Sequence, residues 1–266
     1  MAVDAVHHLA GVVGPRHATS PAYRRSAAWV AGRLRELGYT VRRQRFTVPG
    51  GDSWGVPVGA GTSLNLVARA HGVDPDMPHL VVGAHLDTVP GSPGAEDNGS
   101  GVGVLLAVAE ALQARRSRLP VVLLAFGAEE PRGPTDADHH YGSRAYVASL
   151  GADQRRAVRG MVSLDRVGVG DALGRVPVCS ALDPPGQDPA QARVLHAAAR
   201  AGVPATACRN RSSDHWSFVR DGLPGVRIGS TPYAEYHAAG DLPRVVDRTQ
   251  LARVGRVVLA WLAGGR

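Results

Sequence analysis

The sequence predicts an α/β fold with a mixed, mainly parallel central sheet and helices on both faces. Short apolar runs of strand type alternate with helical patterns, most clearly where Leu80–Ala84 and Val121–Phe126 flank a helical stretch. A strand–helix–strand unit of this kind joins parallel strands and brings their carboxyl ends to one edge of the sheet. The chain has no fixed-period repeat and no long linker, so residues 1–266 are expected to form a single domain.

Local signals place the elements along the chain. Ser20 and Pro21 open a helix, because serine caps a helix and proline suits its first turn, and Gly38 ends it. Pro49–Ala60 is rich in glycine and proline and is expected to be a loop. Asn65 is interpreted as an ordinary edge position of a strand, without a chemical role. The further elements expected are strands at Tyr39–Val48, Ser63–Ala70, Met161–Leu164, Arg175–Ser180 and Val226–Gly229, and helices at Gly142–Leu150, at Pro189–Ala201, from Ser213 onward and after Asp247.

Composition and charge argue against nucleic-acid and membrane partners. The net charge is +7, and all 30 basic residues are arginines scattered among acidic residues. A nucleic-acid-binding protein is expected to cluster its basic residues and to interleave aromatic ones, which make up only 5% here. No apolar run is long enough to cross a bilayer, and the N-terminus lacks the features of a secretory signal. A cytoplasmic protein is therefore expected, with a secreted form that has lost its leader as the alternative.

The two cysteines do not form a recognisable metal motif. Cys179 and Cys208 are far apart in the sequence and have no cysteine or histidine partner at metal-binding spacing. Each is expected to be a buried apolar filler, and a single bridge between them is the alternative.

Charged side chains follow both apolar runs of the central unit. His85 and Asp87 come after the first run, Glu129 and Glu130 come after the second, and Asp97 lies where the intervening helix begins. Because parallel strands end at the same sheet edge, these side chains can meet although they are far apart in sequence. One imidazole among several carboxylates is a ligand set that suits Zn²⁺.

Two zinc ions side by side would take ligands from this set and from Asp165 and His237 later in the chain. Each ion needs a few protein ligands and an open position for water or substrate, and a carboxylate between the ions can bridge them. The expected ligands are His85 and Asp165 for one ion, Glu130 and His237 for the other, and Asp97 as the bridge.

This assignment leaves two carboxylates with other roles. Glu129 is expected to stay free of metal and to act as a general base on a zinc-activated water. Asp87 is expected to hold the second nitrogen of His85 and so to fix its tautomer.

The order of these motifs resembles the zinc exopeptidase family of the bacterial leucyl-type aminopeptidases, which also includes glutamate carboxypeptidase and glutaminyl cyclase. Each motif alone is a weak signal, and together they cover nearly the whole chain. The matching segments are Gly14–Arg16, His85–Asp87, Gly94–Gly101, Phe126–Glu130, Gly142–Ser143, Val162–Asp165, Ser213–Phe218 and Tyr236–Asp241.

The resemblance implies a single zinc exopeptidase catalytic domain that removes N-terminal residues from peptides with a free N-terminus. It implies the five metal ligands given above, Glu129 as the base, Asp87 behind the ligands, and Tyr236 as the residue that steadies the tetrahedral oxyanion. The protein is expected to be a monomer or a small homo-oligomer. The alternatives are a glutaminyl-cyclase-like acyltransferase, a carboxypeptidase or deacylase on the same metal core, and a non-catalytic binding module.

Three features depart from the family pattern or tempt a different interpretation. Arg166 stands where the family often has methionine; it is expected to pair with a loop acid, and binding of a substrate carboxylate is the alternative. In the loop Pro131–Tyr141, His139 and His140 are interpreted as solvated residues. Ser213–His215 is interpreted as a helix start and not as a catalytic triad.

Overall fold

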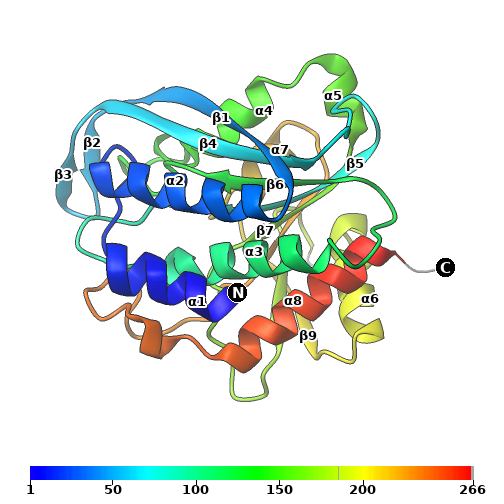
Figure 1. Cartoon of the computed structure of the whole chain (residues 1–266). Helices are drawn as coiled ribbons and strands as arrows, with labels where there is room; N and C mark the ends of the chain where they lie inside the picture. Colours follow the sequence, from blue (N-terminus) through cyan, green and yellow to red (C-terminus); the bar gives the residue numbers. More distant parts are fainter. Residues whose placement is uncertain (185, 265–266) are drawn as a thin grey trace.

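An eight-stranded sheet runs through the computed structural model, which describes residues 1–184 and 186–264 (Figure 1). In order across the sheet, the strands are β1 (Tyr39–Val48), β4 (Gly61–Ala70), β6 (Val121–Phe126), β5 (His79–His85), β7 (Val158–Leu164), β10 (Gly225–Ile228), β8 (Val176–Ser180) and β9 (Ala205–Arg209).

The central strands β6, β5, β7 and β10 are parallel neighbours. His85 at the end of β5 lies opposite Phe126 at the end of β6, so the carboxyl ends of these strands are level. Antiparallel pairs lie farther out: β4 pairs with β6 on one side, and β8 pairs with β10 on the other. The predicted mixed, mainly parallel sheet is confirmed.

Helices cover both faces of the sheet (Figure 1). Because side chains alternate along a strand, neighbouring residues such as Leu123 and Leu124 of β6 belong to separate apolar clusters. One face packs against α1 (Ala2–Val6), α2 (Pro21–Glu36), α3 (Gly101–Ala111), α6 (Pro189–Arg200) and α8 (Arg248–Ala263), and the other against α4 (Tyr141–Ala148) and α7 (His215–Arg220). The short α5 (Ala152–Ala157) precedes β7, and irregular helical turns cover His7–Val13, Ala95–Ser100, Asp136–Asp138 and Pro243–Val245.

Several local predictions are confirmed at atomic detail. The Ser20 hydroxyl accepts a hydrogen bond from the backbone N–H of Tyr23, 3.0 Å away, and so caps α2. The Asp247 carboxylate accepts from the N–H of Thr249 at 2.7 Å and caps α8. The strands β1 and β6 have the predicted bounds. In the described part of the chain, every helix is too short or too polar to cross a lipid bilayer.

The predicted loop Pro49–Ala60 is wrong in one respect, because it contains a small hairpin. The strands β2 (Gly51–Ser53) and β3 (Val56–Val58) pair in antiparallel fashion. Arg132 joins both ends of this hairpin: its guanidinium donates to the carbonyls of Pro49 and Gly59 at 2.8 and 2.9 Å. Strands of three residues carry too little periodicity to be detected in a sequence rich in glycine and proline.

Other elements were also absent from the prediction. The helical segments from Ala2 to Val13, the helix α5 and the strand β9 were not expected. β9 lies at the edge of the sheet with its side chains partly exposed, so it lacks the apolar run of a buried strand.

Asn65 is not an edge residue, because β4 lies between β1 and β6. The Asn65 side chain donates to the Gly142 carbonyl at 2.8 Å and accepts from the Gly127 N–H at 3.1 Å.

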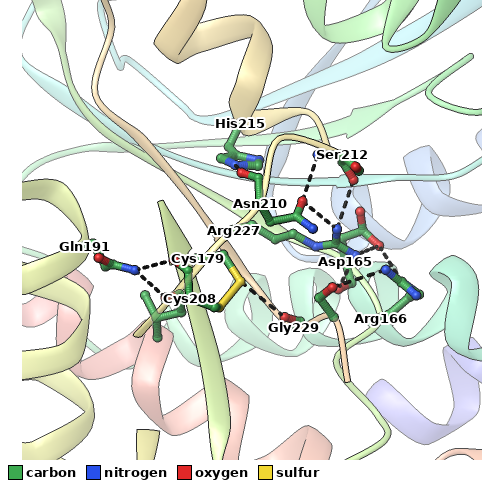
Figure 2. The surroundings of a disulfide bond; sticks show 12 residues. Asp165, Arg166, Cys179, Gln191, Cys208, Asn210, Ser212, His215, Arg227 and Gly229 are labelled. Carbon is green, nitrogen blue, oxygen red and sulfur yellow. Dashed lines mark hydrogen bonds and ion pairs between the residues drawn. A yellow bond between two sulfur atoms is a disulfide. The ribbon is translucent and has the colours of Figure 1, made fainter. Parts of the chain in front are cut away.

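Cys179 and Cys208 form a disulfide bond, so the expectation of two apolar fillers is wrong (Figure 2). The two cysteines are register partners in the parallel strands β8 and β9. Their pairing depends on the alignment of β9 with β8, which no local pattern reveals.

Candidate metal centre

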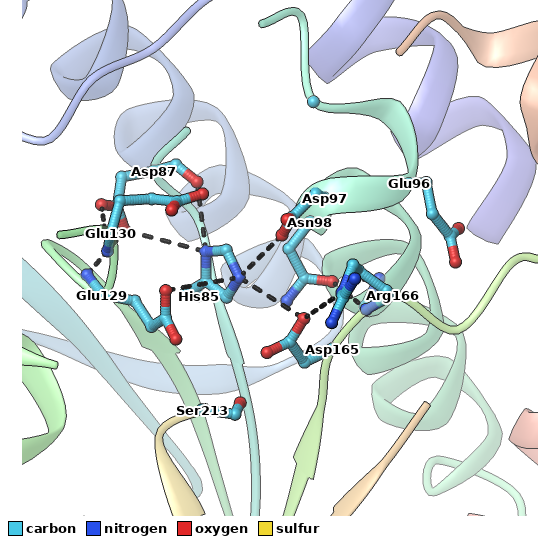
Figure 3. Close-up of polar contacts among 12 residues, drawn as sticks. His85, Asp87, Glu96, Asp97, Asn98, Glu129, Glu130, Asp165, Arg166 and Ser213 are labelled. Carbon is cyan, nitrogen blue, oxygen red and sulfur yellow. Dashed lines mark hydrogen bonds and ion pairs between the residues drawn. The ribbon is translucent and has the colours of Figure 1, made fainter. Parts of the chain in front are cut away.

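The polar residues predicted from the strand ends converge at the carboxyl edge of the central strands (Figure 3). His85 ends β5, Glu129 and Glu130 follow β6, and Asp165 comes directly after β7. Asp97 lies in the irregular turn Ala95–Ser100, which leads into α3. His237 comes from the loop after β10 and completes the group.

Asp97 lies between two histidines. Its Oδ1 is 3.2 Å from Nε2 of His85, and its Oδ2 is 3.2 Å from Nε2 of His237. Asp165 extends the first group, with Oδ1 3.8 Å from His85 Nε2. Glu130 extends the second, with Oε2 3.5 Å from His237 Nε2. The structure thus forms two histidine–carboxylate groups that share Asp97.

The donor atoms fit zinc. Ligand atoms about 2.0–2.2 Å from a tetrahedral zinc ion stand roughly 3.4 Å from one another, close to the separations observed here. Among the described residues, Oε1 of Glu130 is buried without a hydrogen-bond partner. Burial, together with Asp97 and Glu129, raises the pKa of Glu130 well above its usual range. A cation in the centre would offset this repulsion and give the buried oxygen a ligand.

Hydrogen bonds already favour the charged form of Asp97. Burial opposes ionisation, but the contacts from His237 and His85 hold the pKa of Asp97 well below its usual range. A carboxylate that is ionised and faces two imidazoles is chemically suited to bridge two cations.

His140 is buried against Glu129, so its interpretation as a solvated loop residue is wrong. Only 5% of His140 is exposed, and its Nε2 lies 3.2 Å from Oε1 of Glu129. The backbone of His140 has a φ of +58° at the start of α4. Burial opposes ionisation of Glu129, whereas His85 and His140 lower its pKa. His139, the neighbouring residue, is half-buried.

Asp87 supports the site through both its backbone and its carboxylate. The backbone carbonyl of Asp87 lies 3.1 Å from Nδ1 of His85, the nitrogen that Asp87 is expected to hold, and its carboxylate Oδ1 lies 3.9 Å from the same nitrogen. The carboxylate accepts hydrogen bonds from the backbone N–H groups of Glu129 and Glu130 at 3.1 and 3.3 Å. It therefore holds the turn that carries both glutamates.

Arg166 lies beside an acid of the segment that follows β7, as expected, but too far from it for a hydrogen bond. Its guanidinium carbon lies 4.3 Å from the ring centre of Tyr236, and its Nε lies 3.9 Å from Oδ1 of Asp165. The Tyr236 ring in turn stacks on His237, with ring centres 3.7 Å apart, while Trp54 of the β2–β3 hairpin meets His237 edge-on at 4.8 Å. With 62% of Trp54 and 40% of Tyr236 exposed, these side chains border the metal centre on its solvent side.

Ser213–His215 forms no triad, as the sequence indicated. The Ser213 hydroxyl contacts the Ser163 hydroxyl at 2.9 Å, and His215 Nε2 lies 2.8 Å from the Asn210 carbonyl. Asp214 occupies the N-cap position of α7, but its carboxylate makes no capping hydrogen bond to the described residues. Burial raises the pKa of Asp214 to about 7.

Comparison with known proteins identifies the family. The model of peptidase family M28 matches residues 65–262. This chain belongs to peptidase family M28. The zinc exopeptidase resemblance is thereby confirmed, and the membership supports the expected hydrolysis of peptide bonds.

The M28 chain aligns with only part of the length of two curated relatives. Leupeptin-inactivating enzyme 1 of Streptomyces exfoliatus is 33% identical over 148 residues, which cover 55% of this chain and 30% of the relative. Aminopeptidase YwaD of Bacillus subtilis is 30% identical over 212 residues, which cover 75% of this chain and 44% of the relative. The chain thus spans less than half the length of these two relatives.

Solved structures match the M28 chain over nearly its whole length. BSAP, a zinc aminopeptidase from Bacillus subtilis, has a TM-score of 0.82 at 19% identity, covering 98% of this chain and 93% of that one. Fimbriiglobus ruber glutaminyl cyclase has a TM-score of 0.79 at 22% identity, covering 100% and 94%. These likenesses establish the shared fold.

Two further residues help to build the centre. Arg227 was not singled out from the sequence, and Asp241 was included only as the last residue of the Tyr236–Asp241 motif. Arg227 in β10 is buried and donates to Asp165, with Nη2 2.9 Å from Oδ1. Asp241 accepts from the backbone N–H groups of Glu96 and Asp97 at 2.8 and 3.1 Å and so holds the Asp97 turn. A lone arginine within an otherwise apolar strand was the available signal for Arg227, because an unpaired charge is not buried cheaply.

Proposed function

We propose that this chain is a metal-dependent aminopeptidase that removes N-terminal residues from peptides. The observation that carries the proposal is the pair of histidine–carboxylate groups that share Asp97. We assign one zinc ion to His85, Asp97 and Asp165, and a second to Asp97, Glu130 and His237. The catalytic unit is a single domain, and its substrate is a peptide with a free N-terminus.

Family membership and the names of two similar proteins support this choice. The chain matches the peptidase M28 model over residues 65–262, and YwaD and BSAP both bear the name aminopeptidase. The ligand chemistry supports zinc independently, because imidazole and carboxylate groups at these spacings suit that ion.

Bound zinc would polarise the scissile carbonyl and bring the pKa of a water molecule towards neutrality. Glu129 accepts the proton of the attacking water and delivers it to the departing amine. His140 and the backbone contacts to Asp87 keep Glu129 oriented for both transfers. Burial, Asp97 and Glu130 raise the pKa of Tyr236, so its phenol stays protonated and can donate a hydrogen bond to the oxyanion.

The replacement Glu129→Gln tests the role of the base. It should leave two zinc ions per chain by elemental analysis but lower the turnover of leucinamide by roughly 10²- to 10⁴-fold. The control is Glu110→Gln, which alters an exposed acid of α3 and should leave turnover unchanged. Near-normal turnover in Glu129→Gln would refute the assigned role.

The need for a metal and the need for a free N-terminus on the substrate are tested with the wild-type protein. A chelator should abolish hydrolysis of leucylglycinamide, and added zinc should restore it. The N-acetylated form of the same peptide should resist hydrolysis, because an aminopeptidase needs a free N-terminus. Equal rates on the free and blocked peptides would contradict the aminopeptidase assignment.

A further inference from the structure

Arg166 holds a positive charge beside the metal centre (Figures 2 and 3). It directly follows Asp165, and its side chain is only 12% exposed. The guanidinium stacks over Tyr236 and lies near the Asp165 carboxylate. The charge therefore borders the space in which a substrate must lie if the proposed metal ligands act together.

The position of Arg166 is fixed by its backbone and by its side-chain terminus. The backbone N–H of Arg166 donates to Oδ1 of Asn98 at 3.2 Å, and its carbonyl accepts from the N–H of Ser230 at 3.1 Å. Its φ of +55° is unusual for a residue with a side chain and is held by these contacts. At the other end, Nη2 donates to the Ser230 hydroxyl at 3.2 Å. A guanidinium held in this way loses little conformational freedom on binding a ligand.

The guanidinium of Arg166 keeps donors free. It has five N–H groups, and its one hydrogen bond to the described residues goes to Ser230. Arg227, by contrast, donates to Asp165, Asn210 and Ser212. An arginine that is positioned but not saturated is suited to receive a carboxylate, which it binds through paired N–H···O contacts.

Asp165 does not neutralise the positive charge of Arg166. Its Oδ1 is 2.9 Å from Arg227 but 3.9 Å from Arg166, so Arg227 is its principal partner. With cations bound to the carboxylates of the centre, Arg166 would remain an uncompensated positive charge at the substrate side. Such a charge favours anionic over neutral substrates.

We propose that Arg166 selects substrates that carry a free carboxylate close to the scissile bond. Two groups have this chemistry: the terminal carboxylate of a dipeptide, and the acidic side chain of an N-terminal residue. This inference rests on the proposed aminopeptidase function and defines its substrate class.

Matched substrate pairs separate the two sources of carboxylate. Leucylglycine and leucylglycinamide differ only in the terminal carboxylate, whereas the anilides of glutamate and glutamine differ in the side chain. In at least one pair, the wild type should prefer the acid in kcat/KM, and Arg166→Met should lower kcat/KM for that acid by about 10- to 100-fold. The neutral member should change by less than about threefold, because it makes no charge-assisted contact.

Two further variants define the cause. Arg166→Lys keeps the charge and should recover part of the preference, because an ammonium group cannot form the paired contact. Arg43→Met removes an exposed arginine from the edge strand β1 and should leave the preference intact. Loss of the preference in Arg43→Met, or equal effects of Arg166→Met on both members of both pairs, would overturn the proposal.

Binding separates this proposal from the proposed catalysis. In zinc-loaded Glu129→Gln protein, isothermal titration should show that Arg166→Met weakens binding of the preferred acid by about 10- to 100-fold and leaves its neutral partner unaffected. If wild-type protein hydrolyses none of the four substrates, the aminopeptidase function fails, and this titration alone decides the role of Arg166. Equal affinities with and without Arg166 would overturn the carboxylate assignment.

Discussion

Removing the Cys179–Cys208 disulfide should lower stability without abolishing the proposed activity. The double replacement Cys179→Ser and Cys208→Ser opens a closed loop whose ends are 29 residues apart in sequence. In the chain-entropy treatment, a loop of about 30 residues contributes about 3.6 kcal/mol to the free energy of unfolding at 25 °C. For a chain of this size, that loss corresponds to a decrease in Tm of about 7–14 °C.

The structure indicates why activity should persist at 25 °C. The strand β8 stays paired with β10 through Val226–Ser180 and Ile228–Val178 after the covalent link to β9 is lost. Arg227, the partner of Asp165, lies opposite Cys179 in that same pairing and keeps its polar contacts. Hydrolysis of leucinamide by the double variant should therefore stay within about twofold of wild type at a temperature well below its Tm.

Calorimetry with and without dithiothreitol provides the assay. The reductant should lower the Tm of the wild type towards that of the double serine variant and should leave the variant unchanged. Two free thiols in unreduced, denatured wild-type protein would refute the cross-link. A Tm that is the same in both proteins would refute the entropic argument.

The remaining predictions concern His215, Arg227 and Trp54. Burial lowers the pKa of His215 to about 3, so between pH 3 and about pH 6.5 the unfolded chain binds more protons than the folded one. The free energy of unfolding should therefore fall with decreasing pH, by up to about 1.4 kcal/mol per pH unit. In urea titrations, His215→Gln should reduce this slope, and the control His71→Gln, which alters an exposed histidine, should not. Arg227→Met leaves the buried Asp165 carboxylate without its partner at 2.9 Å. In metal-free protein, urea unfolding should show that this variant lowers the free energy of unfolding by about 3–5 kcal/mol and that Arg227→Lys lowers it less. Trp54→Phe should shift Tm by less than about 2 °C, because the indole is largely exposed. It should also remove the change in tryptophan emission that zinc binding causes in the wild type, because Trp54 contacts His237. An unchanged response to zinc would contradict the placement of Trp54 beside the metal centre.

The fold was predictable where one local signal dominates. The apolar run Val121–Phe126 is buried on both faces, and Ser20 with Pro21 gives a helix start that depends on neighbouring residues alone. The hairpin β2–β3 escaped prediction because its strands are only three residues long and because Arg132, which joins its two ends, lies far away in the sequence.

The polar cluster was predictable for a topological reason. Parallel strands must end at one edge, so the positions of His85 and Asp165 at strand ends indicated that they would approach each other. His140 and Arg166 could not be placed in this way. Both have positive φ angles and project from irregular segments, so the direction of each side chain depends on tertiary contacts and not on a periodic pattern.

Arg132 links the border of the metal centre to the segment that carries Glu129 and Glu130. It lies two residues after Glu130, and its guanidinium holds both ends of the hairpin that carries Trp54. The backbone N–H of Asp52 also donates to the Arg132 carbonyl, so the hairpin and the turn bearing Glu129 share one anchor. A replacement of Arg132 would therefore disturb the surroundings of Trp54 and of the proposed base together, although the hairpin lies before residue 65, where the matched family segment begins.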